Sequence, residues 1–184
     1  FAPLVNMLIN GETRIGVSAI FGASEYDRGD LIAQKSSNIQ YPIRITEAID
    51  LNNKNFIGLI EDLILKISNG EDLVGTPQDE NEASYSIWRD NDDYEINWSK
   101  SSDEIKRLID ALGYPYLGAR TSDSKGKKIR IVEAEVVDDV DCELRDAGKV
   151  IFISEGLPVV ICGKGLLRIN QAYNIDSENK SYLP

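Results

Sequence analysis

The apolar positions near the start of the chain change their spacing twice. From Pro3 they recur every three or four residues until Gly11, which predicts a short helix with proline in its tolerated first turn. Over residues 14–21 they alternate with polar or small residues, which predicts a strand with one buried face. The apolar members of this strand are Ile15, Val17, Ala19 and Phe21.

A second strand and a longer helix follow. The stretch D-L-I-A-Q-K-S-S-N-I, which begins at Asp30, has strand character. Over residues 46–69 the helical spacing returns and Gly70 ends it, which predicts a helix long enough to form the outer layer of an α/β fold. The apolar stripe of this helix consists of Phe56, Ile60, Leu63, Ile64 and Ile67.

The second half of the chain has a different character. Residues 70–82 are polar and rich in turn formers, so we expect a linker there. Ser101 and Glu104 form a capping-box signature for a short helix that Gly113 closes. Short β-rich runs separated by glycines follow, which is typical of a small barrel or sandwich. We therefore predict an α/β portion over residues 1–75, a linker over 76–100 and a β-rich domain over 101–184.

Charge limits the classes of partner. The formal charge of −11, from 31 acidic and 20 basic residues, disfavours a large nucleic-acid footprint, because such binding depends on Lys and Arg neutralising phosphates. One dense cationic cluster is the exception. It is either a solvated loop and strand edge, which we prefer, or a local basic site. The cluster consists of Lys125, Lys127, Lys128 and Arg130.

The side chains that are missing or rare limit the chemistry. The sequence contains no histidine, so neither a Ser-His-Asp triad nor a typical zinc site can be assembled from it. Cys142 and Cys162 lack the spacing of a redox or metal pair, and we expect free thiols, with Cys162 acting as a small buried hydrophobe in V-V-I-C. No apolar run approaches the length of a membrane span, and we expect a cytoplasmic protein that does not contact a membrane.

Three stretches, taken in order, resemble the methionyl-tRNA formyltransferase family, which includes the sugar-nucleotide N-formyltransferases. F-A-P-L-V-N-M-L-I-N-G-E-T-R-I-G-V-S with D-R-G-D-L-I-A-Q is similar to the family's P-L, I-x-x-G-E, G-V-T and D-x-G-D-I pattern. T-P-Q-D-E-N-E-A-S-Y and I-N-W-S resemble its Q-D-E, A-T-Y and I-D-W. I-K-R-L-I-D-A-L-G-Y-P-Y-L-G-A is similar to its I-R-A, P-x-P-G-A element.

The resemblance implies both a fold and an activity. The fold would be the carboxy-terminal part of a Rossmann-like formyltransferase domain, followed by a small OB-like barrel. The activity would be transfer of a formyl group from 10-formyltetrahydrofolate to a primary amine, without a metal. The family's N-x-H motif lies upstream of the proline-led helix with which this chain begins. We therefore expect an incomplete chain that is inactive alone.

The resemblance also gives one short motif a role. In E-Y-D-R-G-D, Asp27 matches the family's acid and would take the proton of the amine and orient the missing histidine. The loop Ala23, Ser24, Glu25 and Tyr26 would offer backbone groups to the pterin ring, and Gly29 would permit the tight turn. On the residues alone, Asp27 is as well explained as a turn former. Asp30 is interpreted as a turn or cap residue.

The identity of the acceptor stays open at this stage. The acidic excess favours a small amine, preferably an amino sugar on a nucleotide, and methionyl initiator tRNA is the alternative. An alternative of another class is a non-catalytic binding or subunit-contact module, and a homodimer is one assembly we consider. Aromatic residues of the linker region either stack on bases or sugar rings or, as we prefer, pack the two lobes together. These residues are Tyr85, Trp88 and Trp98.

Overall fold

The computed structural model describes residues 3–86 and 88–175, and the chain divides into two compact units. One unit contains Glu12–Tyr41 and Glu47–Ile87, and the other contains Phe1–Gly11, Pro42–Thr46 and Trp88–Pro184. Within the described residues, no helix is both long enough and apolar enough to cross a lipid bilayer.

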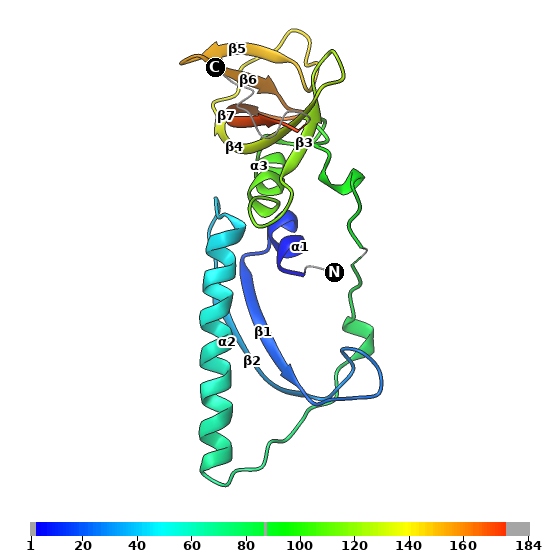
Figure 1. Cartoon of the computed structure of the whole chain (residues 1–184), viewed down its shortest axis with the longest axis vertical. Coiled ribbons are helices and arrows are strands. Elements are labelled where there is room, and N and C mark those ends of the chain that lie inside the picture. Colours follow the sequence, from blue (N-terminus) through cyan, green and yellow to red (C-terminus); the bar gives the residue numbers. More distant parts are fainter. Residues whose placement is uncertain (1–2, 87, 176–184) are drawn as a thin grey trace. The chain divides into compact units, whose positions relative to one another are not determined.

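The first of these units is built on a β-hairpin and a long helix. Strands β1 (Arg14–Ile20) and β2 (Leu31–Asn38) are present, as the sequence pattern predicts, and they pair antiparallel. Helix α2 (Ile45–Ser68) runs alongside the hairpin (Figure 1). The Ser37 hydroxyl donates a hydrogen bond to Asn55 Oδ1 at 2.8 Å, and Lys35 Nζ lies 2.8 Å from Asp62 Oδ2. Polar contacts from β2 therefore hold one face of the helix.

The apolar stripe that predicts α2 is not the face that the fold buries. Ala48, Asn55 and Leu59 are buried, whereas most of the stripe is exposed. The exposed fractions along the stripe are 54% at Phe56, 39% at Ile60, 60% at Ile64 and 58% at Ile67. Helix α2 thus carries a second apolar face, which is the pattern of a helix buried on two sides in a larger α/β layer.

The second unit combines two short helices with a sheet. Helix α1 (Pro3–Asn10) and helix α3 (Ser102–Ala111) pack together, and α3 also packs on strand β4 (Lys128–Val137). Its core consists of fully buried apolar side chains from both helices and from strand β7 (Leu166–Asn174). These include Val5, Leu8, Ile105, Ile109, Leu112, Leu166 and Leu167.

The sheet of this unit has five antiparallel strands in the order β3-β4-β7-β6-β5 (Figure 1). The remaining strands are β3 (Ala119–Ser122), β5 (Val150–Ser154) and β6 (Leu157–Ile161). Among the described residues β3 and β5 do not pair with each other, and the outer edge of β3 is bridged instead by Glu95 opposite Arg120, so the closed form of the expected barrel is not confirmed. Two short 3-10 turns, Glu80–Glu82 and Asp92–Tyr94, lie in the segment before α3.

The capping box predicted for α3 is present. Ser101 Oγ accepts a hydrogen bond from the Glu104 backbone N–H at 3.3 Å, and the Ser101 backbone N–H donates to Glu104 Oε2 at 3.0 Å. The hydrogen bonds from the side chain and backbone of Ser101 hold the pKa of Glu104 below its ordinary value of 4.5. A carboxylate with a lowered pKa stabilises the fold above that ordinary value, and the contribution disappears as the pH falls through the lowered pKa.

We expect Ser101→Ala to lower the free energy of unfolding by about 1 kcal/mol at pH 7. The difference between the variant and the parent chain should shrink as the pH falls from 5 towards about 3, because protonation of Glu104 weakens the capping box. Urea unfolding at several pH values measures this, with the exposed Ser124→Ala as control. Equal stability of variant and parent at pH 7 would contradict the role of the cap.

Candidate functional site

The motif E-Y-D-R-G-D lies in the loop between β1 and β2. The Phe21 backbone N–H donates to the Asp30 carbonyl at 2.9 Å, which closes the base of the loop. A Cβ atom on Gly29 would lie 1.6 Å from the Phe21 carbonyl oxygen. The two limbs of the loop therefore approach so closely that only glycine fits at position 29.

The backbone of this loop is fixed by a residue distant in sequence. Gln78 Nε2 donates to the carbonyls of Asp27 and Gly29, at 2.8 and 2.7 Å. Asp27 has a φ of 59°, a left-handed conformation that Asp tolerates better than most residues. The turn-forming interpretation of Asp27 thus describes its backbone correctly, while its exposed side chain lines a cavity. Asp27 can therefore be a turn residue and also present its carboxylate to the cavity.

This cavity, which we call the acidic cavity, has a volume of about 700 Å³ and lies between the loop and residues 77–85. Arg28 is the basic residue of its lining, and its guanidinium is paired with Glu25 and Glu80, each at 3.0 Å. The lining therefore carries an excess of negative charge, which favours a cationic guest. Its carboxylates are those of Asp27, Asp79, Glu80 and Glu82.

Only part of the predicted site lines the acidic cavity. Tyr26 and Asp27 belong to the lining, and Tyr26 is 99% exposed. Ala23, Ser24 and Glu25 are exposed in the same loop but outside the lining, and Gly29 is buried beneath it. Asp30 closes the base of the loop, as the turn interpretation expects.

The sequence pattern does not indicate the opposite wall of the acidic cavity, because residues 76–100 have the composition of a linker. Thr76 pairs with Leu31 through two hydrogen bonds of 2.8 Å, which fixes the segment at the start of β2. Asp79 then caps a 3-10 turn by accepting from the Asn81 N–H at 2.9 Å. Gln78, Asp79, Glu80, Glu82 and Tyr85 are thereby brought to the acidic cavity.

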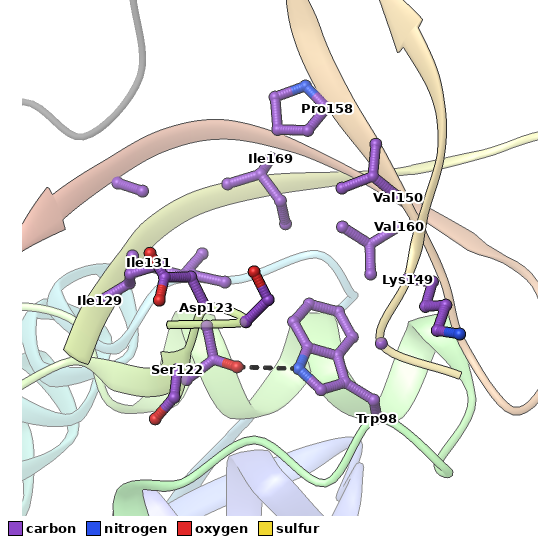
Figure 2. Close-up of a pocket in the computed structure, with 14 residues that line it drawn as sticks. Trp98, Ser122, Asp123, Ile129, Ile131, Lys149, Val150, Pro158, Val160 and Ile169 are labelled. Atoms are coloured by element: carbon purple, nitrogen blue, oxygen red, sulfur yellow. Dashed lines mark hydrogen bonds between the residues drawn. The ribbon is translucent and has the colours of Figure 1, made fainter. Parts of the chain in front are cut away.

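A second cavity, of about 520 Å³, lies on the concave face of the five-stranded sheet (Figure 2). Trp98 forms one wall, and its Nε1 donates to Thr121 Oγ1 at 3.0 Å. A Cβ atom on Gly148 would lie 3.2 Å from the indole, so the backbone at Gly148 packs closely against the ring. Aliphatic side chains form the floor, and the cavity therefore suits apolar groups rather than acid–base chemistry. They include Ile129, Ile131, Val150, Pro158, Val160 and Ile169.

The cationic cluster is partly neutralised. Lys128 Nζ lies 2.7 Å from Glu95 Oε1. The backbone N–H groups of Lys125 and Lys127 both donate to Asp123 Oδ1 at 2.9 Å, which forms the turn before β4. This arrangement agrees with the interpretation of the cluster as a loop and strand edge.

Both cysteines are free thiols, as predicted. Cys162 is completely buried, and this burial raises the pKa of its thiol to about 11 despite the nearby charge of Arg145. Cys162 is therefore a packing residue and not a nucleophile at neutral pH.

Comparison with solved structures shows which known proteins share this fold. The HypX structure from Aquifex aeolicus in complex with tetrahydrofolic acid matches 98% of this chain and 31% of that chain, with a TM-score of 0.70 and 17% identity. An N-formyltransferase from Helicobacter canadensis, in complex with folinic acid and dTDP-3-aminofucose, matches 90% of this chain and 59% of its own, with a TM-score of 0.66 and 17% identity. The chain thus shares its fold with HypX and with this N-formyltransferase.

Comparison of sequences and of a family model also gives formyltransferases as the proteins similar to this chain. The methionyl-tRNA formyltransferase of Sorangium cellulosum is 30% identical over 93% of this chain and 54% of its own length. That of Streptococcus sanguinis is 28% identical over 91% of this chain and 52% of its own. The model of the formyl transferase C-terminal domain matches residues 89–180. The chain belongs to the formyl transferase family and contains its C-terminal domain. It spans about half the length of these curated relatives.

Proposed function

We propose that the whole protein transfers a formyl group from 10-formyltetrahydrofolate to a primary amine, and that the acidic cavity with Asp27 receives this amine. The observation that carries the proposal is the position of Asp27, the acid of the family motif, in the lining of a cavity rich in carboxylates. The family membership and the relatives of twice the length support it.

The acidic cavity suits the first requirement of the reaction. A primary amine near neutral pH is protonated, and a cationic guest is drawn to a lining with four carboxylates and one paired guanidinium. The amine can attack only after it loses a proton, and a carboxylate within hydrogen-bonding distance can accept that proton. We assign this role to Asp27, whose exposed side chain is available to a guest.

Further parts of the site would come from the remainder of the protein. The exposed apolar face of α2 supports a larger α/β layer, because a soluble monomer rarely leaves such a stripe uncovered. In this arrangement Asp27 would also hold the family's histidine in orientation, as a buried carboxylate does in a triad. Negative charge that develops on the formyl oxygen would then be met by the Asn and His of the N-x-H motif.

The described residues are better suited to contact the pterin ring of the folate than its glutamate group. Ala23, Ser24, Glu25 and Tyr26 lie in an exposed loop, so their backbone groups are available to a pterin ring. Arg28 is already paired with two carboxylates, and the lining offers no other basic residue to the folate's glutamate group. We therefore propose pterin contacts at residues 23–26 and place the glutamate end outside the acidic cavity. The folate supplies the formyl group, and no metal is required for this chemistry.

We prefer an amino sugar on a nucleotide as the acceptor. Initiator tRNA presents many phosphates, which the net charge of −11 and the acidic cavity disfavour. The pairing of Lys128 with Glu95 reduces the basic surface of residues 125–130 further. A sugar nucleotide needs only a small polar pocket. The Helicobacter canadensis enzyme, which has this fold, is in complex with such a molecule.

Methionyl-tRNA is the second candidate, and the sequence relatives favour it. Both of the curated relatives described above are methionyl-tRNA formyltransferases. A non-catalytic binding module is the alternative of another class, since Asp27 alone does not complete the site.

Turnover of the full-length protein on the two acceptors distinguishes these candidates. With 10-formyltetrahydrofolate present, we expect a dTDP-linked amino sugar to be formylated at least about tenfold faster, by kcat/KM, than methionyl initiator tRNA. Formylation of the tRNA alone would overturn the preferred acceptor. Folate binding without turnover on either acceptor would favour the binding module.

Three further assignments belong to this proposal. We propose that residues 1–75 are the end of the catalytic domain, that 76–100 connect it to the next domain, and that the sheet within 101–184 is an OB-like barrel open between β3 and β5. We also place the protein in the cytoplasm, where free thiols such as Cys142 and Cys162 persist.

A further inference from the structure

Gln78 binds the loop that carries Asp27 through both hydrogens of its side-chain amide. Its Nε2 donates to the Asp27 carbonyl at 2.8 Å and to the Gly29 carbonyl at 2.7 Å. An amide nitrogen has two hydrogens, so none of them is left for a guest in the acidic cavity. The nitrogen of Gln78 therefore serves the loop and not the guest.

The hydrogen bond from Gln78 to the Asp27 carbonyl fixes the direction of the Asp27 side chain. Asp27 has a φ of 59°, in the left-handed region that a residue with a Cβ atom occupies only at some cost. Rotation about its ψ angle turns the carbonyl relative to the Cα–Cβ bond. Because Gln78 holds the carbonyl, it also holds the Cα–Cβ bond of Asp27. Without this hydrogen bond the backbone at Asp27 can relax towards negative φ and carry the carboxylate away from the lining.

We propose that Gln78 is a positioning residue for Asp27, which keeps the carboxylate in the lining of the acidic cavity, where it accepts the proton of the amine. This inference rests on the proposed function, in which Asp27 is the general base. Gln78 does not touch the reacting atoms in this assignment. It acts on the rate because a small displacement of a catalytic group from its productive position slows the reaction steeply.

The segment that carries Gln78 is bound to the loop and to the start of β2 at two other points. The backbone groups of Thr76 and Leu31 are joined by two hydrogen bonds of 2.8 Å, and Arg28 Nη1 donates to Glu80 Oε1 at 3.0 Å. Gln78 is itself exposed, and an exposed hydrogen bond adds little to stability because water competes for it. Loss of the Gln78 amide should therefore leave the fold and the two other contacts in place.

Gln78→Leu in the full-length protein tests the proposal, because leucine has a similar size but donates no hydrogen bond. With 10-formyltetrahydrofolate and the acceptor that supports turnover, we expect kcat to fall about tenfold. The melting temperature should change little, and amide hydrogen exchange should become faster in residues 23–30 but not in β2. Gln40→Leu changes an exposed glutamine outside the lining and is the matched control, which should behave as the parent protein.

A double-variant cycle with Asp27→Asn separates positioning of the carboxylate from a general structural role. If Gln78 acts through the carboxylate, Gln78→Leu should lower kcat less than about twofold once Asp27 is replaced by Asn, because no base is left to position. A residue that only supports the loop would lower kcat by the same factor in both backgrounds. Single-turnover kinetics with saturating folate and acceptor measures the chemical step in all four proteins.

Three outcomes would overturn the role of Gln78: a parent-like kcat in Gln78→Leu, equal losses in the two backgrounds, or slower turnover with unchanged exchange in the loop. Failure of the proposed function gives a different result. In that case Asp27→Asn itself would keep the turnover of the parent protein, and no carboxylate would need positioning. A slow Asp27→Asn together with a parent-like Gln78→Leu would overturn the role of Gln78 alone.

Discussion

Asp27→Asn in the full-length protein is expected to lower kcat about a hundred- to ten-thousandfold, the range for removal of a general base. Asn tolerates the left-handed backbone at position 27 as well as Asp does, so the loop should keep its conformation. The hydrogen bonds from Gln78 should also survive, because they go to the backbone carbonyls of Asp27 and Gly29. The variant therefore removes the charge and leaves the turn.

The matched control for this variant is Asp72→Asn, which changes an exposed aspartate outside the acidic cavity. Its turnover should equal that of the parent protein within experimental error. Single-turnover kinetics with saturating folate and acceptor separates the chemical step from binding. If Asp27→Asn retained turnover within a few-fold and stayed folded, Asp27 would be a turn residue only.

Gly29→Ala is expected to give the second largest effect, because a methyl group at this position cannot be accommodated without moving the backbone. Its Cβ atom would lie 1.6 Å from the Phe21 carbonyl oxygen. We expect the free energy of unfolding to fall by about 1–3 kcal/mol, the usual cost of overpacking. We also expect turnover to fall more than tenfold, since Asp27 moves with the loop.

Gly22→Ala supplies the control within the same loop. A Cβ atom at position 22 has nothing within 4 Å, so neither stability nor turnover should change measurably. Thermal unfolding and kcat measured on both variants test the prediction. Parent-like activity of Gly29→Ala would mean that the position of the loop does not control the site.

The elements predicted from the sequence were those with local signals. Helix α3 was predicted because Ser101 and Glu104 cap it through bonds within one turn. Strands β1 and β2 were predicted because the alternation and the composition of their residues are local signals, whereas their antiparallel pairing was not predicted. The openness of the five-stranded sheet could not be predicted, because closure depends on pairing between β3 and β5, which are distant in sequence.

The face that α2 buries could not be predicted for a related reason. Periodicity identifies an apolar stripe but not the element that covers it. In this chain the hairpin contacts the side of α2 that carries Asn55 and Leu59, while Phe56 and Ile64 are exposed. The predicted helix is confirmed, and its buried side differs from the stripe.

Of the two walls of the acidic cavity, only the loop between β1 and β2 could be predicted from the sequence. The family motif identified Asp27, and the turn chemistry of Gly29 agreed with the same loop. Gln78 and the carboxylates after it reach the loop through the pairing of Thr76 with Leu31, which no local pattern indicates. A polar, turn-rich segment was therefore interpreted as a linker although it forms half of the acidic cavity.

Formyl transfer is measured by mixing the full-length protein with 10-formyltetrahydrofolate and a dTDP-linked amino sugar and following the formyl group. Mass spectrometry of the acceptor and absorbance of the folate follow both products. We expect an acceptor heavier by one carbonyl group and an equal amount of tetrahydrofolate. Release of tetrahydrofolate with an unchanged acceptor, or no reaction with any primary amine, methionyl-tRNA included, would contradict it.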